Sequence, residues 1–394
     1  MPRLLQIDTC LALKSTGRIT ESIAKLAISR GWECHIIHGA RTLGETVQNH
    51  YQATTLLGTY FHFIESYLFD RHGLGSKRTT KTIIETIEKI EPDLIQLHCI
   101  HGYYINYKVL FEYLNKKNIP LVWTFHDCWA FTGHCAHFVT VGCEKWKTEC
   151  YKCPLRKDYP KSLIDCSRRN FQLKKRLFTS NNNLHIVAVS QWLADLAKQS
   201  FFKECDIRVI NNGVDTTVFH PCSGKSSESF KILGVASDWN AGKGLFDFYK
   251  IREKLSEKEY EITLVGLTQK QIEELPKGIT GIAKTNSVTE LAKLYSEANV
   301  FVNPTYADSF PTVNMEALSC GTPIITYKTG GSPEIIDDIT GVVVEQGDTE
   351  GLVRAIANMK EKQLSSEKCR ERALARFDKE QRFMDYIKMY EELI

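Results

Sequence analysis

The sequence predicts an α/β protein made of two doubly wound, Rossmann-like domains. Three observations support this prediction. Short apolar runs alternate along the chain with segments that carry helical spacing of apolar residues, which is typical of a parallel sheet covered by helices. The 394 residues are too many for one hydrophobic core. A polar stretch over 220–229, which contains Pro, Gly and several Ser, separates two such series.

Each series supplies alternating strands and helices. In the first, we expect strands at 4–7, 33–38, 94–98, 121–125 and 185–189, and helices at 18–30, 79–90, 106–116 and 191–198. In the second, we expect strands at 231–236, 261–266, 300–302, 323–326 and 341–344, and helices at 245–255, 289–297, 312–319 and 349–362. A last amphipathic helix is expected over 379–394, because Phe383, Tyr386, Ile387 and Tyr390 share one stripe.

The composition is that of a globular protein, with 43% hydrophobic and 25% charged residues. No apolar run approaches the roughly 20 residues that cross a bilayer. The first residues lack the charged segment and long apolar run of a signal peptide. We therefore expect a cytoplasmic protein. A dinucleotide dehydrogenase is disfavoured because no G-x-G-x-x-G follows a predicted strand, and the P-loop pattern is also missing.

Polar residues follow the predicted strands of the first domain, at the carboxyl ends where doubly wound sheets bind ligands. Gly17 would let the backbone approach a ligand, and Arg18 places a cation at the same helix start. His126 directly follows the strand 121–125 and offers a donor and an acceptor to sugar hydroxyls, with Asp127 placed to orient it. A buried structural histidine is the alternative interpretation.

The second domain carries a possible phosphate and sugar site. Lys243 lies between two glycines just before a helix, which suits a phosphate close to the backbone. Asp308 lies in a loop and Glu316 about one turn into the next helix, where carboxylates can accept hydrogen bonds from sugar and ribose hydroxyls. The intervening residues would direct free N–H groups of the helix start to the same site; they are Ser309, Phe310, Pro311 and Thr312. Two surface acids at a helix start are the alternative.

Seven segments in order carry a resemblance that covers nearly the whole chain. They are STGRI (15–19), the segment 124–135 around His126, AVSQWLADL (188–196), VINNGVDTTVFHP (209–221), GKG (242–244), the D-x7-E block (308–316) and TGGSPEII (329–336). Together they resemble the family-4 glycosyltransferases of GT-B fold, in particular the bacterial polysaccharide-assembly branch of colanic acid and capsule type. Several segments in register are far more specific than any one of them.

The resemblance implies two Rossmann-like domains that face each other across a cleft. The N-terminal, acceptor-side domain would span 1–218, with a Cys-rich insertion at 127–170 and the helix 379–394 packed back onto it. The C-terminal domain, at 219–378, would bind the nucleotide sugar. The implied reaction is retaining transfer from a nucleoside-diphosphate sugar, with UDP or GDP as nucleotide, to a glycan or lipid-linked acceptor in surface polysaccharide biosynthesis.

The resemblance also implies a role for each matching residue. In such enzymes Glu316 would hold the ribose, Asp308 the transferred sugar, and Lys243 would neutralise the leaving diphosphate. Gly17 would let the first domain approach the phosphates, and His126 would contact the donor sugar near the reacting carbon.

The chain departs from the family pattern at three positions. Asp308 replaces the more common Glu, Ser237 stands where an Arg is usual, and Gly242 stands where an Arg is frequent. Neutralisation of the diphosphate would then depend on Lys243, with Arg18 as a hypothesised helper.

Catalysis is expected to need no metal or other cofactor, since no Asp-x-Asp pair is present to hold a divalent cation against a diphosphate. A nucleotide-sugar epimerase or a phosphorylase of the same fold is an alternative function. A non-catalytic sugar-nucleotide-binding protein is the alternative from another class.

Six of the thirteen cysteines lie within residues 128–166. Among them, Cys135, Cys143, Cys150 and Cys153 include a C-x2-C pair and could form a tetrahedral structural zinc site. Free or redox-active thiols, and disulfides, are the alternatives.

Residues 145–176 contain eleven Lys and Arg against three acids. The segment could be a solvated surface helix, or it could contact an anionic membrane or an acidic acceptor. In the second case the protein would be peripheral at the inner face of the cytoplasmic membrane. Nucleic acid is not an expected partner, because no base-reading motif accompanies the charge.

Overall fold

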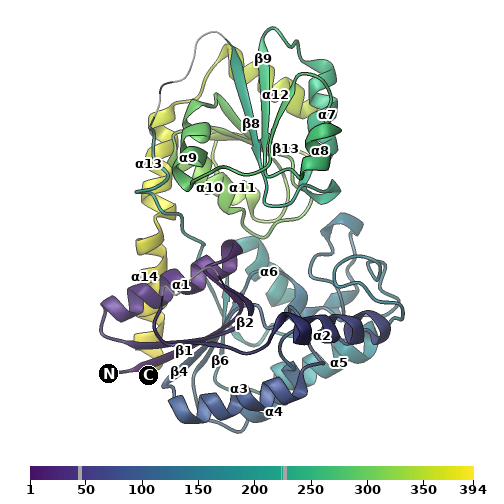
Figure 1. Cartoon of the computed structure of the whole chain (residues 1–394), viewed down its shortest axis with the longest axis vertical. Helices are drawn as coiled ribbons and strands as arrows, with labels where there is room; N and C mark the ends of the chain where they lie inside the picture. The colour runs from purple at the N-terminus through teal and green to yellow at the C-terminus, as the bar shows by residue number, and fades with distance from the viewer. Residues whose placement is uncertain (43–46, 223, 225–228) are drawn as a thin grey trace. The chain divides into compact units, whose positions relative to one another are not determined.

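The computed structural model describes residues 1–42, 47–222, 224 and 229–394. The chain forms two compact units (Figure 1): unit 1 comprises Met1–Asn211 and Phe383–Ile394, and unit 2 comprises Asn212–Arg382. The units divide after Asn211, whereas the resemblance implied a boundary after residue 218, and the linker at 220–229 lies partly outside the described residues. Within the described part of the chain, every helix is too short or too polar to span a lipid bilayer.

Unit 1 is built on a seven-stranded parallel sheet of order β3-β2-β1-β4-β5-β6-β7. Its strands are β1 (Arg3–Leu11), β2 (Glu33–Thr42), β3 (His50–Gln52), β4 (Leu94–Leu97), β5 (Leu121–Phe125), β6 (Leu184–Ala188) and β7 (Asp206–Val209). Its helices are α1 (Lys14–Ser29), α2 (Leu56–Phe69), α3 (Lys77–Ile90), α4 (Tyr107–Leu114), α5 (Ser167–Phe178) and α6 (Gln191–Gln199). The β5–α5 connection contains only 3-10 turns, at Trp129–Phe131, Val139–Val141 and Lys145–Lys147.

Unit 2 is built on a six-stranded parallel sheet of order β10-β9-β8-β11-β12-β13. Its strands are β8 (Phe230–Val235), β9 (Tyr260–Val265), β10 (Ile279–Ile282), β11 (Val300–Asn303), β12 (Ile324–Tyr327) and β13 (Gly341–Val344). Its helices are α7 (Leu245–Lys254), α8 (Gln269–Glu273), α9 (Val288–Glu297), α10 (Thr312–Ser319), α11 (Ser332–Ile335), α12 (Thr349–Glu361) and α13 (Ser366–Phe377), with a 3-10 turn at Ala241–Lys243.

The short apolar runs that predicted the strands reflect burial of each strand on both faces of the sheet. Leu4, Leu94 and Val122 come from three neighbouring strands of unit 1 and pack into one core with Ile19 and Ile23 of α1. Strands covered on both faces are rich in apolar residues, which is why short apolar runs located them.

The last helix, α14 (Lys379–Leu393), begins in unit 2 and continues into unit 1. Its predicted apolar stripe is buried: Phe383, Tyr386 and Tyr390 belong to the same core as β1 and α1. The hydroxyl of Tyr390 donates to the side-chain oxygen of Gln96, at 2.5 Å, in β4. Unit 1 therefore takes part of its core from the carboxyl end of the chain.

Candidate functional site

The candidate site of unit 2 lies where the strand order reverses. The chain runs from β8 outward through β9 to β10, and then returns to β11 on the other side of β8. The loops after β8 and β11 therefore leave neighbouring strands in opposite directions. Crevices at such switch points are the usual ligand sites of doubly wound sheets.

Backbone contacts hold these two loops together. The N–H of Tyr306 donates to the carbonyl of Gly242 at 2.9 Å, and the hydroxyl of Thr305 donates to the same oxygen at 3.3 Å. Gly244 has φ of +75°, and a Cβ there would lie 2.2 Å from the carbonyl oxygen of Pro304. Only glycine fits this conformation and this close approach, so the fold itself requires the second glycine of the GKG segment.

Lys243 and Asp308 form an ion pair between the two loops. The Nζ of Lys243 lies 2.7 Å from Oδ2 of Asp308, and Oδ1 of Asp308 accepts the N–H of Phe310 at 3.2 Å. Their side chains are 34% and 23% exposed, so a ligand can reach both. Exposed ion pairs contribute about 0–1 kcal/mol to stability. The pair therefore matters for the site rather than for holding the fold.

The start of α10 adds donors beside this pair. Ser309 is buried, and its hydroxyl has no hydrogen-bond partner among the described residues. Gly330 packs against the same loop, because a Cβ there would lie 1.8 Å from the carbonyl oxygen of Asp308. Buried hydroxyls normally find a partner. A phosphate oxygen at the N-terminus of α10 would supply one and would also be favoured by the helix dipole.

Glu316 is held in a fixed orientation one turn into α10. Its Oε2 accepts the hydroxyl of Tyr295, in α9, at 3.0 Å. Burial raises the pKa of Tyr295 well above its ordinary value, and the charge of Glu316 raises it further, so the phenol keeps its proton and remains a donor. A carboxylate held in this way can also accept hydrogen bonds from a diol.

Unit 1 offers a chain of neutral polar groups at the carboxyl ends of its central strands. The Nε2 of His98 lies 3.1 Å from the side-chain oxygen of Gln6, and Nδ1 of His98 lies 3.1 Å from Nε2 of His126. The amide nitrogen of Gln6 donates to the carbonyl of Thr20, which fixes the amide orientation. His98 must then donate through Nε2 and accept through Nδ1, so that neutral His126 donates through Nε2 and presents Nδ1 as an acceptor.

Both histidines are neutral near pH 7. Burial lowers the pKa of His126 to about 4, although the charge of Asp127 acts in the opposite direction. Burial also lowers the pKa of His98 well below its ordinary value, and neighbouring His126 adds to the effect. The two rings stack at 5.4 Å between centroids. His126 is thus a neutral hydrogen-bonding group.

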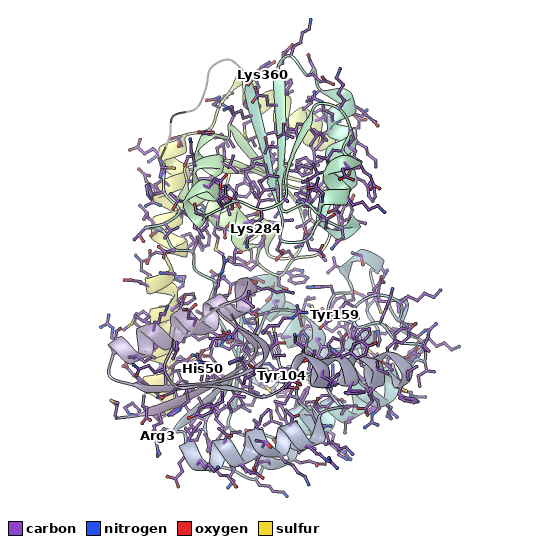
Figure 2. All side chains as sticks on the ribbon, in the orientation of Figure 1. Arg3, His50, Tyr104, Tyr159, Lys284 and Lys360 are labelled. Atoms are coloured by element: carbon purple, nitrogen blue, oxygen red, sulfur yellow. The ribbon has the colours of Figure 1, made fainter. Side chains whose placement is uncertain are left out.

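The expected pairing of Asp127 with His126 is wrong. Asp127 instead lies 3.0 Å from Nε2 of His101 and accepts the N–H of Trp129 at 2.8 Å. Burial opposes ionisation of Asp127, but the interactions with His101, His137 and the N–H of Trp129 together lower the pKa of Asp127. The hydroxyl of Tyr159, labelled in Figure 2, lies 3.4 Å from the other ring nitrogen of His101. The loop after β5 therefore orients His101.

Gly17 has a packing role in α1. A Cβ at Gly17 would lie 3.0 Å from both the carbonyl oxygen and the sulfur of Cys10 at the end of β1. Arg18, the next residue, is exposed. Asp8 lies buried in the same strand, where burial raises its pKa to about 6 against hydrogen bonds from Thr9 and Thr20. The ligand roles of Gly17 and Arg18 stay predictions.

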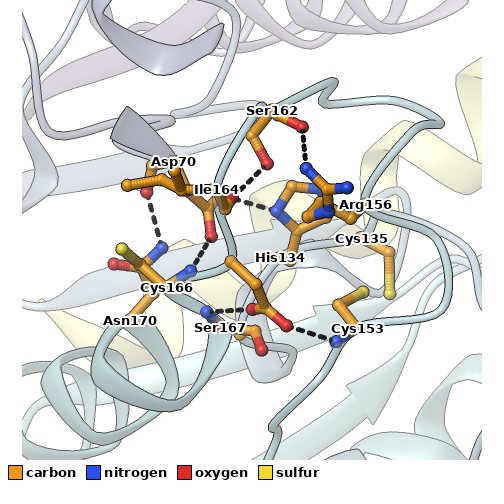
Figure 3. A network of polar contacts seen from close by, with 12 residues as sticks. Asp70, His134, Cys135, Cys153, Arg156, Ser162, Ile164, Cys166, Ser167 and Asn170 are labelled. Atoms are coloured by element: carbon orange, nitrogen blue, oxygen red, sulfur yellow. Dashed lines mark hydrogen bonds and ion pairs between the residues drawn. The ribbon is translucent and has the colours of Figure 1, made fainter. Parts of the chain in front are cut away.

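The cysteine-rich connection is a polar network around two carboxylates, of buried Asp70 and exposed Asp165 (Figure 3). Asp70 accepts from Nδ1 of His134 at 2.6 Å and from the N–H of Cys166 at 2.7 Å. Asp165 accepts the N–H groups of Cys153 and Ser167 at 2.6 and 2.8 Å. These bonds replace regular secondary structure in a long connection, where backbone groups still need partners.

Cys135 and Cys153 form a thiol pair in this network. A hydrogen bond from Cys135 lowers the pKa of Cys153 to about 7, against the opposing effect of burial, and raises that of Cys135. All thirteen cysteines are free thiols. Within the described residues, no three His, Cys, Asp or Glu side chains are spaced to hold a metal ion. Zinc binding by Cys135, Cys143, Cys150 and Cys153 stays a prediction, which would require these sulfurs to move closer together.

The structure brings Lys243 and Asp308 into contact and places Ser309, Phe310, Pro311, Thr312 and Glu316 in the same loop and helix of unit 2. Three partners were missed from the sequence: His98, His101 and Tyr295. His98 ends a predicted strand and could have been found by the rule that located His126. No local pattern connects Tyr295 with Glu316 or His101 with Asp127.

Comparisons with known proteins agree with this architecture. Residues 16–218 match the family described as Glycosyltransferase Family 4, and residues 230–362 match the family described as Glycosyl transferases group 1. The putative colanic acid biosynthesis glycosyl transferase WcaC of Escherichia coli K12 is 28% identical over 374 residues, covering 89% of each chain.

Solved structures share the fold over the full length. Sucrose-phosphate synthase from Thermosynechococcus elongatus has a TM-score of 0.74 at 17% identity, with 100% of this chain and 99% of that chain covered. HepE of Anabaena, solved with UDP, has a TM-score of 0.68 at 16% identity, with 99% and 100% covered.

Two Rossmann-like units, shared over the full length with these solved structures, form a GT-B fold. The two family matches show that the protein is a glycosyltransferase. The chain belongs to Glycosyltransferase Family 4. The fold class and the family resemblance predicted from the sequence are confirmed.

The low pKa of His126 makes stability depend on pH. Between its ordinary pKa of about 6.5 and its folded value of about 4, the unfolded chain binds a proton that the native protein does not. The free energy of unfolding should therefore fall as the pH falls from 6.5 to 4. Urea denaturation at several pH values measures this dependence. The slope of the free energy of unfolding against pH should be smaller in His126→Gln than in wild type, by at most about 1.4 kcal/mol per pH unit. Identical slopes would contradict the neutral assignment.

Proposed function

We propose that the protein transfers a hexosyl group from a UDP- or GDP-sugar to a hydroxyl of a glycan or lipid-linked saccharide, with retention, in surface polysaccharide biosynthesis. The contact of Lys243 with Asp308 at the switch point of unit 2, 2.7 Å long, carries the proposal. HepE, solved with UDP and UDP-glucose, supports the donor class. WcaC, named for colanic acid biosynthesis, supports the process.

Unit 2 would stabilise the charge of the leaving group. As the bond between the anomeric carbon and the phosphate oxygen breaks, negative charge grows on the departing diphosphate. Lys243 and the free N–H groups at the start of α10 would stabilise that charge where it develops. Asp308 pairs with Lys243. With donor, Lys243 would exchange this carboxylate for a phosphate, and Asp308 would become free to accept a sugar hydroxyl.

Glu316 would bind the ribose diol of the nucleotide. Its Oε2 already accepts from Tyr295, so the carboxylate is oriented before the donor arrives. Preorganised acceptors need little rearrangement on binding. His126, as a neutral ring with Nδ1 as acceptor, would hydrogen-bond a donor-sugar hydroxyl. The acceptor hydroxyl would attack on the face that the diphosphate leaves and pass its proton to the departing phosphate oxygen, which would give retention.

Removal of the cation should affect turnover more than folding. Lys243→Ala should lower kcat about 10²–10³-fold, as loss of one preorganised charge-stabilising group typically does. Lys250→Ala is the matched control, because Lys250 is an exposed lysine of α7. Release of UDP or GDP across a panel of nucleotide sugars measures both. Full turnover by Lys243→Ala in its folded form would refute the assignment.

Catalysis should proceed without a divalent cation. Lys243 and α10 supply the positive charge that a metal would otherwise supply, and the chain has no Asp-x-Asp pair. Donor turnover should therefore be the same in EDTA as in added Mg²⁺. Loss of turnover in chelator, followed by recovery with Mg²⁺, would overturn the metal-independent mechanism.

A further inference from the structure

Helix α2 presents its apolar residues to solvent and its polar residues to the protein. Its buried side chains are His62 and Ser66. Leu56, Leu57, Tyr60, Phe61 and Phe69 are each more than half exposed, at 65%, 63%, 58%, 63% and 52%. A surface helix of a globular protein normally shows the reverse. Figure 1 shows α2 on the surface of unit 1, with no element drawn in front of it.

Specific polar bonds hold α2 in this orientation. The N–H of Gly75 donates to Nε2 of His62 at 3.1 Å, so Nδ1 carries the proton and donates to the hydroxyl of Ser76 at 2.8 Å. Thr55 caps the helix by accepting the N–H of Gly58 at 3.2 Å. Burial lowers the pKa of His62 to about 4, so these bonds persist at neutral pH. Rotation that buried the apolar side would break them.

The cysteine-rich connection extends the apolar surface. The N–H of Leu163 donates to the carbonyl of Tyr67 in α2 at 2.7 Å. Leu163 and Ile164 are themselves 51% and 45% exposed. Residues far apart in sequence therefore contribute to one exposed apolar surface, which is the usual mark of a binding surface rather than of scattered exposure.

Cations border this surface. Helix α2 has no Lys or Arg, and its single acid, Glu65, is paired with Arg71 at 2.7 Å. The exposed charged residues nearby are Lys77 and Arg78 at the start of α3, and Lys157, Asp158, Lys161 and Asp165 in the connection that bonds to α2, so cations outnumber acids. Apolar and aromatic side chains flanked by Lys and Arg suit the interface of an anionic bilayer. With 14 residues, α2 can lie in that interface but cannot cross the bilayer.

We propose that the exposed face of α2 inserts into the headgroup region of an anionic lipid bilayer, with Lys77, Arg78, Lys157 and Lys161 against the lipid phosphates. Within the basic segment 145–176 the proposal assigns membrane contact to Lys157 and Lys161, beside α2. Lys174 of this segment takes no part, since it is buried and donates to the carbonyl of Trp129 at 2.6 Å. The proposal does not depend on the transferase reaction. The alternative is that a second copy of this chain binds the exposed face of α2.

Vesicle co-sedimentation tests the proposal. The full chain should bind vesicles of phosphatidylcholine with phosphatidylglycerol, and bind pure phosphatidylcholine vesicles more weakly. Phe61→Glu should lower binding at least about tenfold, because it removes a large apolar group and adds a charge that anionic lipid repels. Phe246→Glu is the matched control, since Phe246 lies in α7 of unit 2 and is 58% exposed. The double variant Lys157→Ala, Lys161→Ala should bind the two vesicle types with more similar affinity than wild type does.

Two further measurements separate the outcomes. Tyr60→Trp should show a blue shift of Trp fluorescence with phosphatidylglycerol vesicles, which reports insertion directly. Light scattering gives the oligomeric state without lipid. A dimer that Phe61→Glu converts to monomer, together with no vesicle binding by wild type, would overturn the proposal in favour of self-association. Equal binding by Phe61→Glu and Phe246→Glu would also overturn it. Donor hydrolysis by each variant shows that the active site is intact.

Discussion

The ion pair between Lys243 and Asp308 depends on the reversal of strand order in unit 2. Because β8 and β11 are neighbours, the loops that follow them meet at the same edge of the sheet. Gly244 and Pro304 then bring the two backbones into contact, which leaves the lysine and the carboxylate 2.7 Å apart. An accessible pair of this kind contributes little to stability. In the proposed function it is a preorganised charge to which a diphosphate would bind.

The two units offer different electrostatics at corresponding edges of their sheets. Unit 2 presents a cation, two carboxylates and the start of α10. Unit 1 presents a hydrogen-bonded chain of neutral side chains, Gln6, His98 and His126. Burial keeps His126 neutral. In the proposed reaction, charged groups would suit a diphosphate that gains charge, and neutral hydrogen-bonding groups would suit sugar hydroxyls, which do not.

Much of the fold follows from local pattern, because strands covered on both faces are short apolar runs between amphipathic helices. The residues at strand ends, such as His126, and the loop with Asp308 could be located by the same rule. Contacts between distant elements could not. Asp127 pairs with His101 rather than with its neighbour His126, and Tyr295 reaches Glu316 from another helix.

Helix α2 shows a second limit of sequence patterns. Its apolar residues lie on the solvent side, and a histidine and a serine form the buried side, so the usual search for an apolar inner stripe does not find it. The cysteine spacing suggested a four-ligand zinc set, which stays a prediction; the hydrogen bond between Cys135 and Cys153 is a contact that the spacing did not indicate. Both cases depend on tertiary packing that no local period encodes.

A structure of the protein with a nucleoside-diphosphate sugar bound tests the central claim most directly. The account predicts that the Nζ of Lys243 leaves Asp308 for a phosphate oxygen, that the Ser309 hydroxyl gains a phosphate partner, and that Glu316 contacts the ribose. A donor bound elsewhere, with the Lys243–Asp308 pair intact, would contradict it.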